Sequence, residues 1–577
     1  MSKKLRTVRE ITPEEIFLDS SNLPRRDEPQ FEGRVVRPIG SQPILGVGLA
    51  FILITLIFSA RAFELAIVHG ETYAEVSREN RLDHSLVFAP RGLIYDRTEK
   101  ELAWNERQSA TSTVSATSSP ESYTAGTSAS YPLRRYIEDP GFSHVLGFVR
   151  YPRADMNGIW WREETSGISG VELAFDDLLA GQNGAVMVET NALGEKREQS
   201  IVESAVGGGD IALSIDADVQ TKLHSYLLQH AEARGFVGGA GVIMDVHSGE
   251  LLALVSFPEY SNQKFTDGDA SAVEAASESP RTPLLNRAVS GLYAPGSIVK
   301  PIFAAAALAE GIISPEKEIR STGAITVPNP YDPTKPSVFR DWAVHGLVNM
   351  RDALAVSSDE YFYTIGGGYG TQPGLGIRRL DEYARRFGLG ATAGIALLGE
   401  EAGVIPTPEW KAEVFGLDDP WRIGNTYHTA IGQYGFQITP LQAVRFVAAV
   451  ANGGTLLRPQ LFAGAAPDGS PVGVSDEYLR VVREGMRLAV TSPRETATVK
   501  ILQMPGLAIA AKTGTAQIGA KNEWIHSWSV GFWPADAPRY AYAVVLEQAP
   551  AGTRSGAAPA LRPFFEWLVL NKPEYLD

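Results

Sequence analysis

At residues 294–301 the chain reads Ala294-Pro295-Gly296-Ser297-Ile298-Val299-Lys300-Pro301, a stretch that combines turn residues, a serine and a lysine. Pro295 and Gly296 allow a sharp turn, and Pro301 falls within a first helical turn, where its missing N–H costs little. The apolar run 302–308 predicts that the helix continues. We therefore expect Ser297 at the N-terminus of a helix.

The combination of Ser297 with Lys300 predicts an acyl-transferring serine site. A serine hydroxyl needs a base within hydrogen-bond reach, and a lysine three residues later lies on the same helical face. Lys300 can be that base if burial and a nearby cation favour its neutral form. The helix N-terminus adds N–H groups and a positive dipole end where an oxyanion would develop. Because Ser-x-x-Lys also recurs by chance, the assignment depends on two further motifs.

The second motif, Lys512-Thr513-Gly514-Thr515, stands where the edge of an antiparallel sheet is expected. It follows the apolar stretch 507–511 and precedes two strand candidates, 526–532 and 540–547, which a turn at 534–538 separates. An edge strand can pair with an extended peptide, and this one carries a lysine and two hydroxyls that can hold a terminal carboxylate.

The third motif is Ser357-Ser358-Asp359, at the head of the apolar stretch 361–363. In order and approximate spacing, the three motifs resemble the Ser-x-x-Lys, Ser-x-Asn and Lys-Thr-Gly set of the penicillin-recognising serine transpeptidases and β-lactamases. Asp359 departs from the commonest form, which has Asn, and an aspartate cannot donate a hydrogen bond from an amide. Among the relatives, Ser-x-Asp most resembles the elongation branch of the class B penicillin-binding proteins.

The resemblance implies a role for each motif residue. Lys300 takes the proton of Ser297, which attacks the penultimate D-Ala carbonyl of a peptidoglycan stem peptide. Ser357 relays a proton to the departing D-Ala, Lys512 keeps the local potential positive, and Asp359 contacts the lysine or accepts a substrate N–H. An amine from a neighbouring stem then closes the cross-link. The expected substrate-binding residues are Thr513, Gly514 and Thr515, and the expected oxyanion hole consists of the N–H groups of Ser297 and Thr515.

Composition limits the remaining possibilities. With 577 residues the chain should contain two or three domains. Its net charge of -15 argues against a nucleic-acid partner, and its lack of cysteine excludes thiol catalysis, disulfides and thiolate metal sites. Asp332, Asp341 and His345 offer an alternative interpretation as metal ligands, but such side chains on a polar loop are more often solvated or ion-paired. We expect neither a metal nor a cofactor.

An uncharged apolar segment of about 17 residues, 44–60, is at the short end of what spans a bilayer. A buried core helix would show a polar face, which this segment lacks. A cleaved signal peptide is favoured by Ala60-Arg61-Ala62, but the polar leader before the segment is too long. We therefore expect an uncleaved signal anchor.

The orientation of this anchor follows from the arginines around it. They are slightly more frequent close before the span than after it, so the positive-inside rule places the N-terminus in the cytoplasm. Residues 1–43 are expected to be a disordered cytoplasmic tail. The predicted location is the bacterial cytoplasmic (inner) membrane, crossed once, with the catalytic domain on the periplasmic side.

Residues 61–209 are expected to form a non-catalytic, dimerisation-like pedestal. Residues 61–81 have helical spacing with a break near Gly70, and residues 89–97 followed by Glu101-Leu102-Ala103 predict a strand, a turn and a second strand with an Arg/Asp pair. The stretch 89–97 resembles the Arg-Gly-x-Ile-x-Asp-Arg motif that opens the pedestal of class B penicillin-binding proteins.

Resemblance to the class B pedestal resumes in three later blocks, 144–149, 167–172 and 178–184. Between the 89–97 stretch and these blocks, the Ser/Thr-rich run 109–130 has no hydrophobic period and is interpreted as a linker or as a weak strand plus a loop. Elongation-type relatives usually carry a larger pedestal head in this region, so the resemblance implies that the head is shortened here.

Residues 210–577 are expected to form the transpeptidase domain. Residues 210–216 alternate as a strand, 219–233 have helical spacing, and 240–245 with 251–256 predict a hairpin around Ser248-Gly249. The resemblance implies an α/β (α+β) fold of the penicillin-binding or serine β-lactamase-like kind, with an antiparallel sheet flanked by helices. A short extended pedestal and one transmembrane helix precede it.

Some residues near the motifs also have structural interpretations. Asp359 can merely cap the following helix, and Ser358 is expected to be a spacer whose side chain faces away. Trp342 and Trp524 can line the cleft, although aromatic residues of the core are commoner.

The expected function is a peptidoglycan D,D-transpeptidase of cell-wall elongation that β-lactams inhibit covalently. The alternatives are a division-type transpeptidase, a β-lactamase or β-lactam sensor, and a scaffold that chiefly activates a membrane glycosyltransferase. A β-lactamase needs an activated water, and no extra carboxylate motif for this purpose is evident. The partners implied by the resemblance are stem peptides, β-lactams and a glycosyltransferase of the shape, elongation, division and sporulation family, with no nucleic acid.

Overall fold

The computed structural model describes residues 41–79, 82–106, 131–156, 159–190, 196–329, 332 and 334–576. By internal contacts the chain divides into two compact units, one of Met1–Asp83 with Val188–Glu198 and the other of His84–Met187 with Gln199–Asp577. Most of the expected tail, residues 1–40, and all of the Ser/Thr-rich run 109–130 lie outside the described residues.

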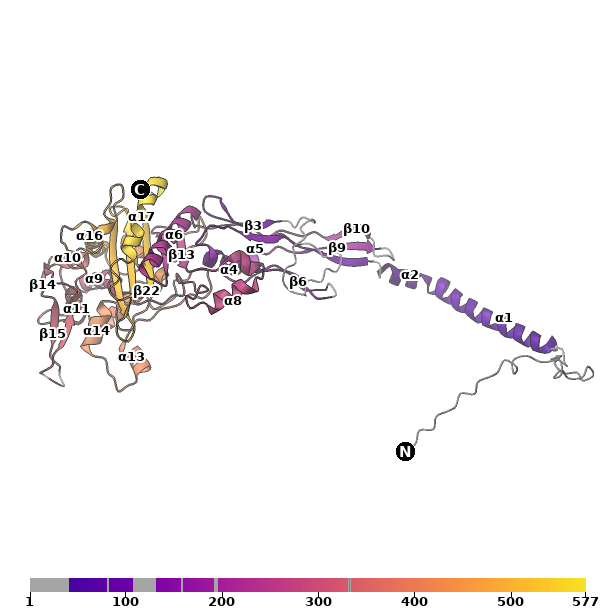
Figure 1. Cartoon of the computed structure of the whole chain (residues 1–577), viewed down its shortest axis with the longest axis horizontal. Helices are drawn as coiled ribbons and strands as arrows, with labels where there is room; N and C mark the ends of the chain where they lie inside the picture. Colours follow the sequence, from indigo (N-terminus) through magenta and orange to yellow (C-terminus); the bar gives the residue numbers. More distant parts are fainter. Residues whose placement is uncertain are drawn as a thin grey trace, which may run out of the picture. The chain divides into compact units, whose positions relative to one another are not determined.

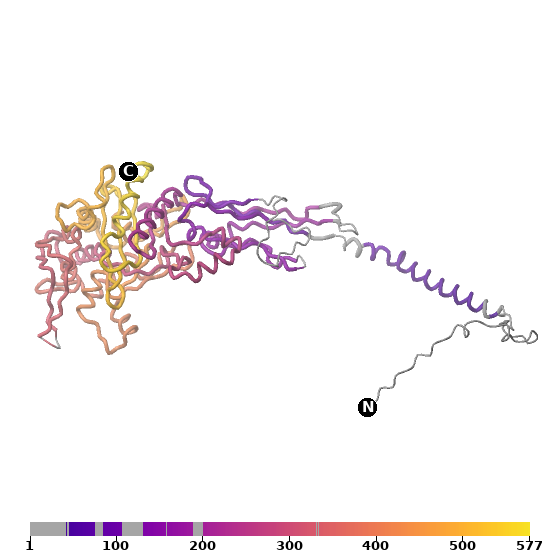
Figure 2. The backbone as a smooth tube through the Cα atoms, in the orientation of Figure 1, coloured from indigo at the N-terminus to yellow at the C-terminus, as the bar shows by residue number. Residues whose placement is uncertain are grey.

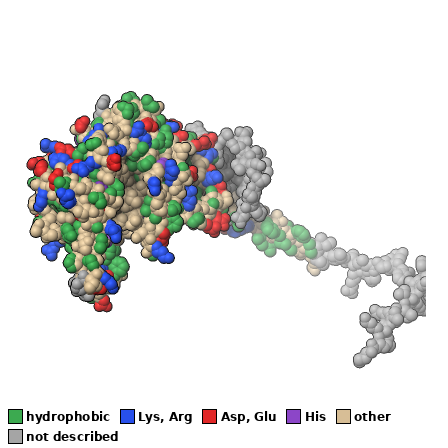
Figure 3. All heavy atoms as spheres, turned by 60° about the vertical axis from the view of Figure 1, so that its left-hand side comes forward, with side chains coloured by type: hydrophobic (Ala, Val, Ile, Leu, Met, Phe, Trp, Pro, Cys, Tyr) green, Lys and Arg blue, Asp and Glu red, His purple; other side chains and the backbone are tan. Residues whose placement is uncertain are grey.

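The first unit contains a long apolar helix. α1 (Ser41–Phe63) runs into a π-helical turn, η2 (Glu64–Val68), which is followed by α2 (Gly70–Glu79). Residues Leu45–Val68 are long and apolar enough to cross a membrane. Most of their hydrophobic side chains are exposed, as the helix in Figure 3 illustrates. The helix extends beyond the predicted 44–60 at both ends, and the predicted break near Gly70 is confirmed.

The expected pedestal consists of small sheets and short helices. A three-stranded sheet has the order β1-β9-β10, and a four-stranded sheet has the order β11-β2-β3-β4. Ribbons pair β5 with β8 and β6 with β7. The bounds are β1 (Leu82–Val87), β2 (Ile94–Tyr95), β3 (Glu101–Glu106), β4 (Leu133–Tyr136), α3 (Ser143–Leu146), β5 (Val149–Arg150), β6 (Arg153–Ala154), β7 (Trp160–Arg162), β8 (Ser166–Gly167), α4 (Gly170–Ala174), α5 (Asp176–Leu179), β9 (Gly184–Thr190), β10 (Lys196–Glu203) and β11 (Ile211–Ala212).

The strand predicted over 210–216 is much shorter and lies in the pedestal sheet. Only Ile211 and Ala212 form a strand, and they pair in parallel with Ile94 and Tyr95. The chain turns into the next helix at Asp216, whose side chain caps that helix. The prediction was wrong because period-2 alternation cannot say which partner strand is within reach. The domain boundary at 210 stays a prediction.

The pedestal motif 89–97 is organised by a buried ion cluster. Arg91 Nε lies 2.5 Å from the carboxylate of Glu172, and Arg134 Nε lies 2.7 Å from the other oxygen of that carboxylate. Arg91 also pairs with Asp176, at 2.6 Å. Asp96 instead accepts hydrogen bonds from the turn that follows it. Arg91 and Asp96 thus have different partners, and the structural interpretation of this motif is the one that its contacts support.

We predict that Glu172→Gln destabilises the chain strongly, because it leaves two buried guanidinium groups without their shared carboxylate. Breaking a buried pair of this kind costs about 3–5 kcal/mol. Denaturant unfolding of the two proteins measures the difference. The matched control is Glu106→Gln, which removes an exposed carboxylate paired with Arg135 at 2.7 Å and should cost far less. Equal losses in the two variants would contradict the prediction.

The C-terminal part of the chain is built on a five-stranded antiparallel sheet with the order β13-β12-β22-β21-β20. Figure 2 shows its early strands beside its late ones, drawn in yellow, although they are far apart in sequence. The bounds are β12 (Gly238–Asp245), β13 (Leu251–Phe257), β20 (Ala510–Ile518), β21 (Trp524–Trp533) and β22 (Tyr540–Pro550). The predicted hairpin, the two predicted late strands and the edge position of the Lys512 motif are confirmed.

Helices cover both faces of this sheet, so its central strands are buried on both sides. Val242 and Met244 of β12 belong to one apolar cluster and Ile243 belongs to the other, as the alternation of strand side chains requires. The first cluster includes α9 (Lys300–Ala309) and α15 (Pro440–Ala451), and the second includes α6 (Ala217–Arg234) and α17 (Ala557–Asn571). Figure 1 labels α9 on one side of the yellow strands and α6 on the other. The helix predicted over 219–233 is α6, and it covers the second face.

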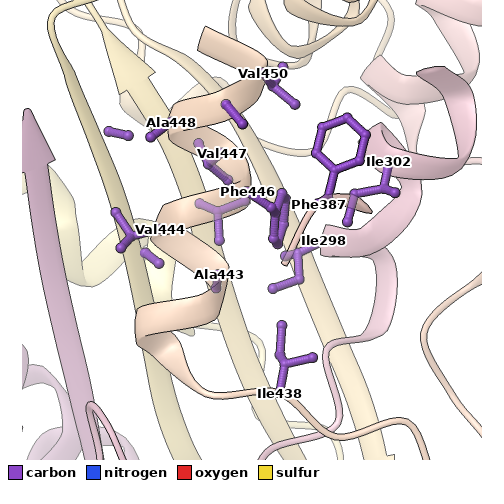
Figure 4. Close-up of a cluster of buried hydrophobic side chains, with 14 of the residues drawn as sticks. Ile298, Ile302, Phe387, Ile438, Ala443, Val444, Phe446, Val447, Ala448 and Val450 are labelled. Carbon is purple, nitrogen blue, oxygen red and sulfur yellow. The ribbon is translucent and has the colours of Figure 1, made fainter. Parts of the chain in front are cut away.

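Helix α15 lies between the sheet and the segment that carries Ser297. Its side chains Val444, Val447 and Phe446 fill the space between the strands and Ile298 (Figure 4). Thr439 and Gln442 form a capping box at its start, and Pro440 occupies its first turn. This helix therefore gives the nucleophile segment a rigid apolar support.

The remaining helices and short ribbons of this region have the following bounds. The helices are α6 (Ala217–Arg234), α7 (Asn262–Thr266), α8 (Ala270–Glu278), η3 (Gly296–Val299), α9 (Lys300–Ala309), α10 (Met350–Val356), α11 (Asp359–Gly367), α12 (Gly376–Arg386), α13 (Pro408–Phe415), α14 (Ile423–Ala430), α15 (Pro440–Ala451), α16 (Asp476–Thr491), η4 (Lys500–Leu502), α17 (Ala557–Asn571) and η5 (Pro573–Tyr575). The ribbons pair β14 (Ile319–Ser321) with β17 (Gly346–Val348), β15 (Ala324–Val327) with β16 (Ser337–Arg340), and β18 (Thr455–Leu457) with β19 (Gly469–Pro471).

Candidate active site

Ser297 lies in the short 3-10 turn η3, directly before helix α9, whose first residue is the fully buried Lys300. The turn is held by backbone contacts at Gly296, whose N–H donates to Gly432 O at 2.9 Å. Gly296 has a φ of +55°, and a Cβ there would lie 2.9 Å from Thr515 O. Only glycine fits this position, so the sequence around Ser297 allows its turn to touch the edge strand β20.

Lys300 joins the nucleophile helix to the Ser357-Ser358-Asp359 segment. Its Nζ donates to Ser357 O at 2.8 Å, to Ser357 Oγ at 3.3 Å and to Asp359 Oδ1 at 2.7 Å. The Phe362 ring adds a cation–π contact, with its centroid 5.3 Å from the ammonium. The buried charge of Lys300 is thus paired with the carboxylate of Asp359.

Ser357 brings the two motif lysines together. Its hydroxyl accepts from Lys512 Nζ at 2.8 Å as well as from Lys300. Ser357 ends helix α10 with a φ of +59°, a left-handed conformation that is uncommon for a residue with a side chain. Such backbone strain persists only where surrounding contacts impose it, and it is concentrated at functional sites.

The two lysines and the carboxylate influence one another electrostatically. Burial, and after it the positive charge of Lys300, lowers the pKa of Lys512 well below its usual value. The carboxylate of Asp359 acts in the opposite direction. Lys512 therefore loses its proton at a lower pH than an exposed lysine does.

The edge strand β20 presents its motif on two faces. Lys512 and Gly514 point toward the nucleophile turn, since a Cβ at Gly514 would lie 2.6 Å from Pro295 O and 2.9 Å from Ile298 Cγ2. By strand alternation, Thr513 and Thr515 share the opposite side. Thr513 is half-buried and Thr515 is exposed. Two hydroxyls on one side of an edge strand are suitably arranged to hold one carboxylate together.

The structure differs from the sequence-based predictions for Ser358 and Asp359: Ser358 caps a helix, and Asp359 does not. Ser358 is fully buried and caps α11, since its Oγ accepts from Tyr361 N–H at 3.2 Å and donates to Asp341 Oδ2 at 2.7 Å. The prediction that Ser358 is a spacer was wrong, and so was the alternative that Asp359 caps the helix. Asp359 is instead the partner of Lys300.

The three residues considered as metal ligands do not come together. Asp332 accepts hydrogen bonds from Thr334, whereas Asp341 lies 3.4 Å from His345. Among the residues that the structure describes, no group of three His, Cys, Asp or Glu side chains is arranged to hold a metal ion. Trp342 donates its indole N–H to Val356 O, directly before Ser357. Trp524 is the first residue of β21 and pairs with Ile518, at the end of β20 that lies beyond the Lys512 motif.

A cavity of about 690 Å³ lies between the β15–β16 ribbon and the start of α14. Its lining includes Phe339, Trp421 and His428. The His428 ring meets the Tyr363 ring edge-on at 6.5 Å between centroids. Burial lowers the pKa of His428, and the carboxylate of Asp359 opposes this shift. His428, a residue of the cavity lining, is thus within electrostatic range of Asp359.

Several supporting residues were not found by sequence reasoning. Gly432 and Trp528 hold the nucleophile turn, the latter through an indole N–H donated to Ala294 O at 3.0 Å. Asp341 was considered only as a metal ligand. A single sequence holds no signal for these contacts, apart from the glycine at 432, because their partners are distant in the chain.

Comparisons with known proteins place the chain in a family. The penicillin binding protein transpeptidase domain matches residues 239–566, and the penicillin-binding protein dimerisation domain matches residues 114–213. The chain is 31% identical over 477 residues to the peptidoglycan D,D-transpeptidase MrdA of Escherichia coli, covering 76% of this chain and 72% of that protein. It is 32% identical over 475 residues to MrdA of Acinetobacter baumannii, covering 76% of this chain and 66% of that protein.

Solved structures lead to the same family. Pseudomonas aeruginosa PBP2 in complex with WCK 5153 has a TM-score of 0.65 at 27% identity, covering 86% of this chain and 98% of that one. A chain of a peptidoglycan synthase complex that coordinates polymerization and crosslinking has a TM-score of 0.69 at 27% identity, covering 93% and 99%. The chain therefore belongs to the penicillin-binding protein transpeptidases. Within them it is a class B member of the elongation type, and the predicted fold class, branch and D,D-transpeptidase activity are confirmed.

We predict that Asp359→Asn moves the titration of Lys512 to lower pH, because the carboxylate that raises the pKa of Lys512 is lost. Carbon-13 NMR of labelled lysine side chains over a pH series measures the midpoint. Asp332→Asn is the matched control, since Asp332 pairs with Lys335 and not with Lys512. A Lys512 midpoint that stays in place or rises in Asp359→Asn would contradict the prediction.

Proposed function

We propose that this chain cross-links peptidoglycan through an acyl-enzyme on Ser297 during cell-wall elongation. The observation that carries the proposal is the buried network of Lys300, Ser357, Asp359 and Lys512 beside the Ser297 turn. Ser297 Oγ attacks the penultimate D-Ala carbonyl of a stem peptide, and its proton passes to the neutral amine of Lys300. The carboxylate of Asp359, whose Oδ1 lies 2.7 Å from Lys300 Nζ, is placed to accept the proton that Lys300 must lose before it acts as the base.

The tetrahedral intermediate places an oxyanion between the turn and the edge strand. We assign its donors to the N–H groups of Ser297 and Thr515, a proposal supported by the tight packing of Gly296 on the Thr515 backbone. The Ser357 hydroxyl then passes a proton to the departing D-Ala, and the lysines on either side of it resupply that proton. Collapse of the intermediate leaves the acyl group on Ser297.

Substrate recognition is assigned to the edge strand. The Thr513 and Thr515 hydroxyls bind the terminal carboxylate, the positive potential of Lys512 favours it, and Gly514 allows the strand to approach the turn. The amine of a second stem enters from the cavity beside His428, attacks the acyl carbon and returns the proton to Ser297. No metal or cofactor takes part in this sequence of steps.

We predict that the parent protein forms one stable adduct with a penicillin and that Ser297→Ala forms none. Intact mass spectrometry over hours measures both. Ser290→Ala is the matched control, because Ser290 lies shortly before Ser297 in the chain but donates its hydroxyl to Gly399 O. Rapid loss of the adduct from the parent would favour a β-lactamase, and the absence of any adduct would favour the scaffold function.

Lys300→Met should slow acylation by about 100-fold or more, as expected for loss of a general base.

We further propose that the helix Leu45–Val68 anchors the chain in the bacterial cytoplasmic membrane with the catalytic domain on the periplasmic side. Its length and apolar character support the span, and the arginine distribution supports the orientation. The proposed partner beside it is a membrane glycosyltransferase of the shape, elongation, division and sporulation family. The similarity to a chain of a peptidoglycan synthase complex supports this partner.

We predict that protease added to spheroplasts digests the catalytic domain and leaves a tag at the N-terminus intact, because only the tail lies inside. Immunoblots against both ends measure this. A tag placed after Asp577 serves as the exposed control. Digestion of the N-terminal tag with protection of the C-terminal one would contradict the proposed orientation.

A further inference from the structure

The catalytic segment around Ser357 does not hold its shape by itself. Ser357 has a left-handed backbone with a φ of +59°, and its hydroxyl must meet two lysines at once. A non-glycine residue in this conformation is strained and needs contacts that impose it.

Asp341 contacts the segment on both sides of Asp359. Its Oδ2 accepts from Ser358 Oγ at 2.7 Å and from Glu360 N–H at 2.9 Å. Ser358 and Glu360 flank Asp359 in sequence. One carboxylate oxygen of Asp341 therefore fixes both the Ser358 side chain, which caps α11, and the Glu360 backbone. The other oxygen accepts from Trp342 N–H at 2.8 Å and lies 3.4 Å from His345 Nε2.

The neighbours of Asp341 hold the same segment from further positions. The Trp342 indole N–H donates to Val356 O at 3.1 Å, directly before Ser357. Asp341 N–H donates to Gly323 O at 2.8 Å, and the buried carboxylate of Glu360 accepts from Gly323 N–H at 2.9 Å. The loop at Gly323 and the end of β16 thus form a closed set of hydrogen bonds with the start of α11.

The burial and the hydrogen bonds of the Asp341 carboxylate suit it to hold the segment around Ser357. Its side chain is fully buried. Burial alone would raise its pKa, but the nearby His345 ring, hydrogen bonds from Glu360 N–H and Ser358, and the charge of Lys300 lower the pKa to about 2. An ionised carboxylate only accepts hydrogen bonds, so all of these donors can be satisfied together.

We propose that Asp341 is a positioning residue that sets the Ser357–Asp359 segment for acylation of Ser297. It acts through Ser358 and the Glu360 backbone, and it does not touch the reacting atoms. This inference rests on the proposed function, since it assumes that Ser357 and Asp359 act in the acylation of Ser297. Loss of Asp341 should therefore reduce the rate of acylation in molecules that are still folded.

The test compares Asp341→Asn with the parent protein in stopped-flow acylation by a fluorescent penicillin. Asparagine keeps the volume and one acceptor oxygen, but its amide faces the Trp342 N–H or the Ser358 hydroxyl with a donor. We expect the acylation rate constant to fall about ten-fold or more, as misplacement of catalytic groups predicts. The final amplitude, which measures the fraction of competent molecules, should stay close to that of the parent.

Asp352→Asn is the matched control. Asp352 lies on the adjacent helix α10 and pairs with Arg494 at 2.9 Å, and its carboxylate is not bonded to the segment 357–359. This variant should keep the parental rate constant. A second control, the double variant Ser358→Ala with Asp341→Asn, should lose less than the sum of the single effects, because Asp341 acts partly through Ser358.

Three outcomes would overturn the proposal. They are a parental rate constant in Asp341→Asn, a reduced amplitude with an unchanged rate constant, and an equal loss in Asp352→Asn. The second outcome would assign Asp341 to folding alone. Failure of the proposed function is distinct from these, because the parent protein itself would then form no adduct or would lose it rapidly.

Discussion

The active site depends on a close approach of two backbones that are distant in sequence. The turn at Gly296 packs against Thr515, and Gly514 packs against Pro295, so that no side chain separates the serine turn from the edge strand. Gly432 closes the turn from its other side. Because a Cβ at any of these positions would overlap a neighbouring backbone, the three glycines determine where Ser297 lies relative to the Lys512 motif.

A second constraint is the burial of two lysine side chains in one place. Lys300 and Lys512 are both fully buried and share the Ser357 hydroxyl. Asp359 pairs with Lys300 at 2.7 Å, which gives a physical reason for the departure from the commoner asparagine. Buried charges need a partner and hydrogen bonds, and the segment that carries the partner is itself held by Asp341.

Sequence reasoning succeeded where the signal is local. The strands after Lys512, the hairpin around Ser248-Gly249 and the helix after Lys300 were predicted correctly, because hydrophobic period and turn residues act over a few positions. It failed where a partner had to be chosen. Ile211 and Ala212 joined the pedestal sheet, Arg91 paired with Glu172, and Ser358 rather than Asp359 capped α11. Each of these choices depends on which distant group is within reach.

The sequence by itself determined the family, the order of the three motifs and the residue types of the site. It could do so because the chemistry of acyl transfer requires a serine, a lysine and a carboxylate-binding strand edge in any such protein. Only the tertiary structure decided that Asp359 pairs with Lys300, that Ser357 joins two lysines and that Asp341 supports their segment. The physical reason is that a hydrogen bond is a property of distance and direction, and folding alone brings these groups within 3 Å or so of each other.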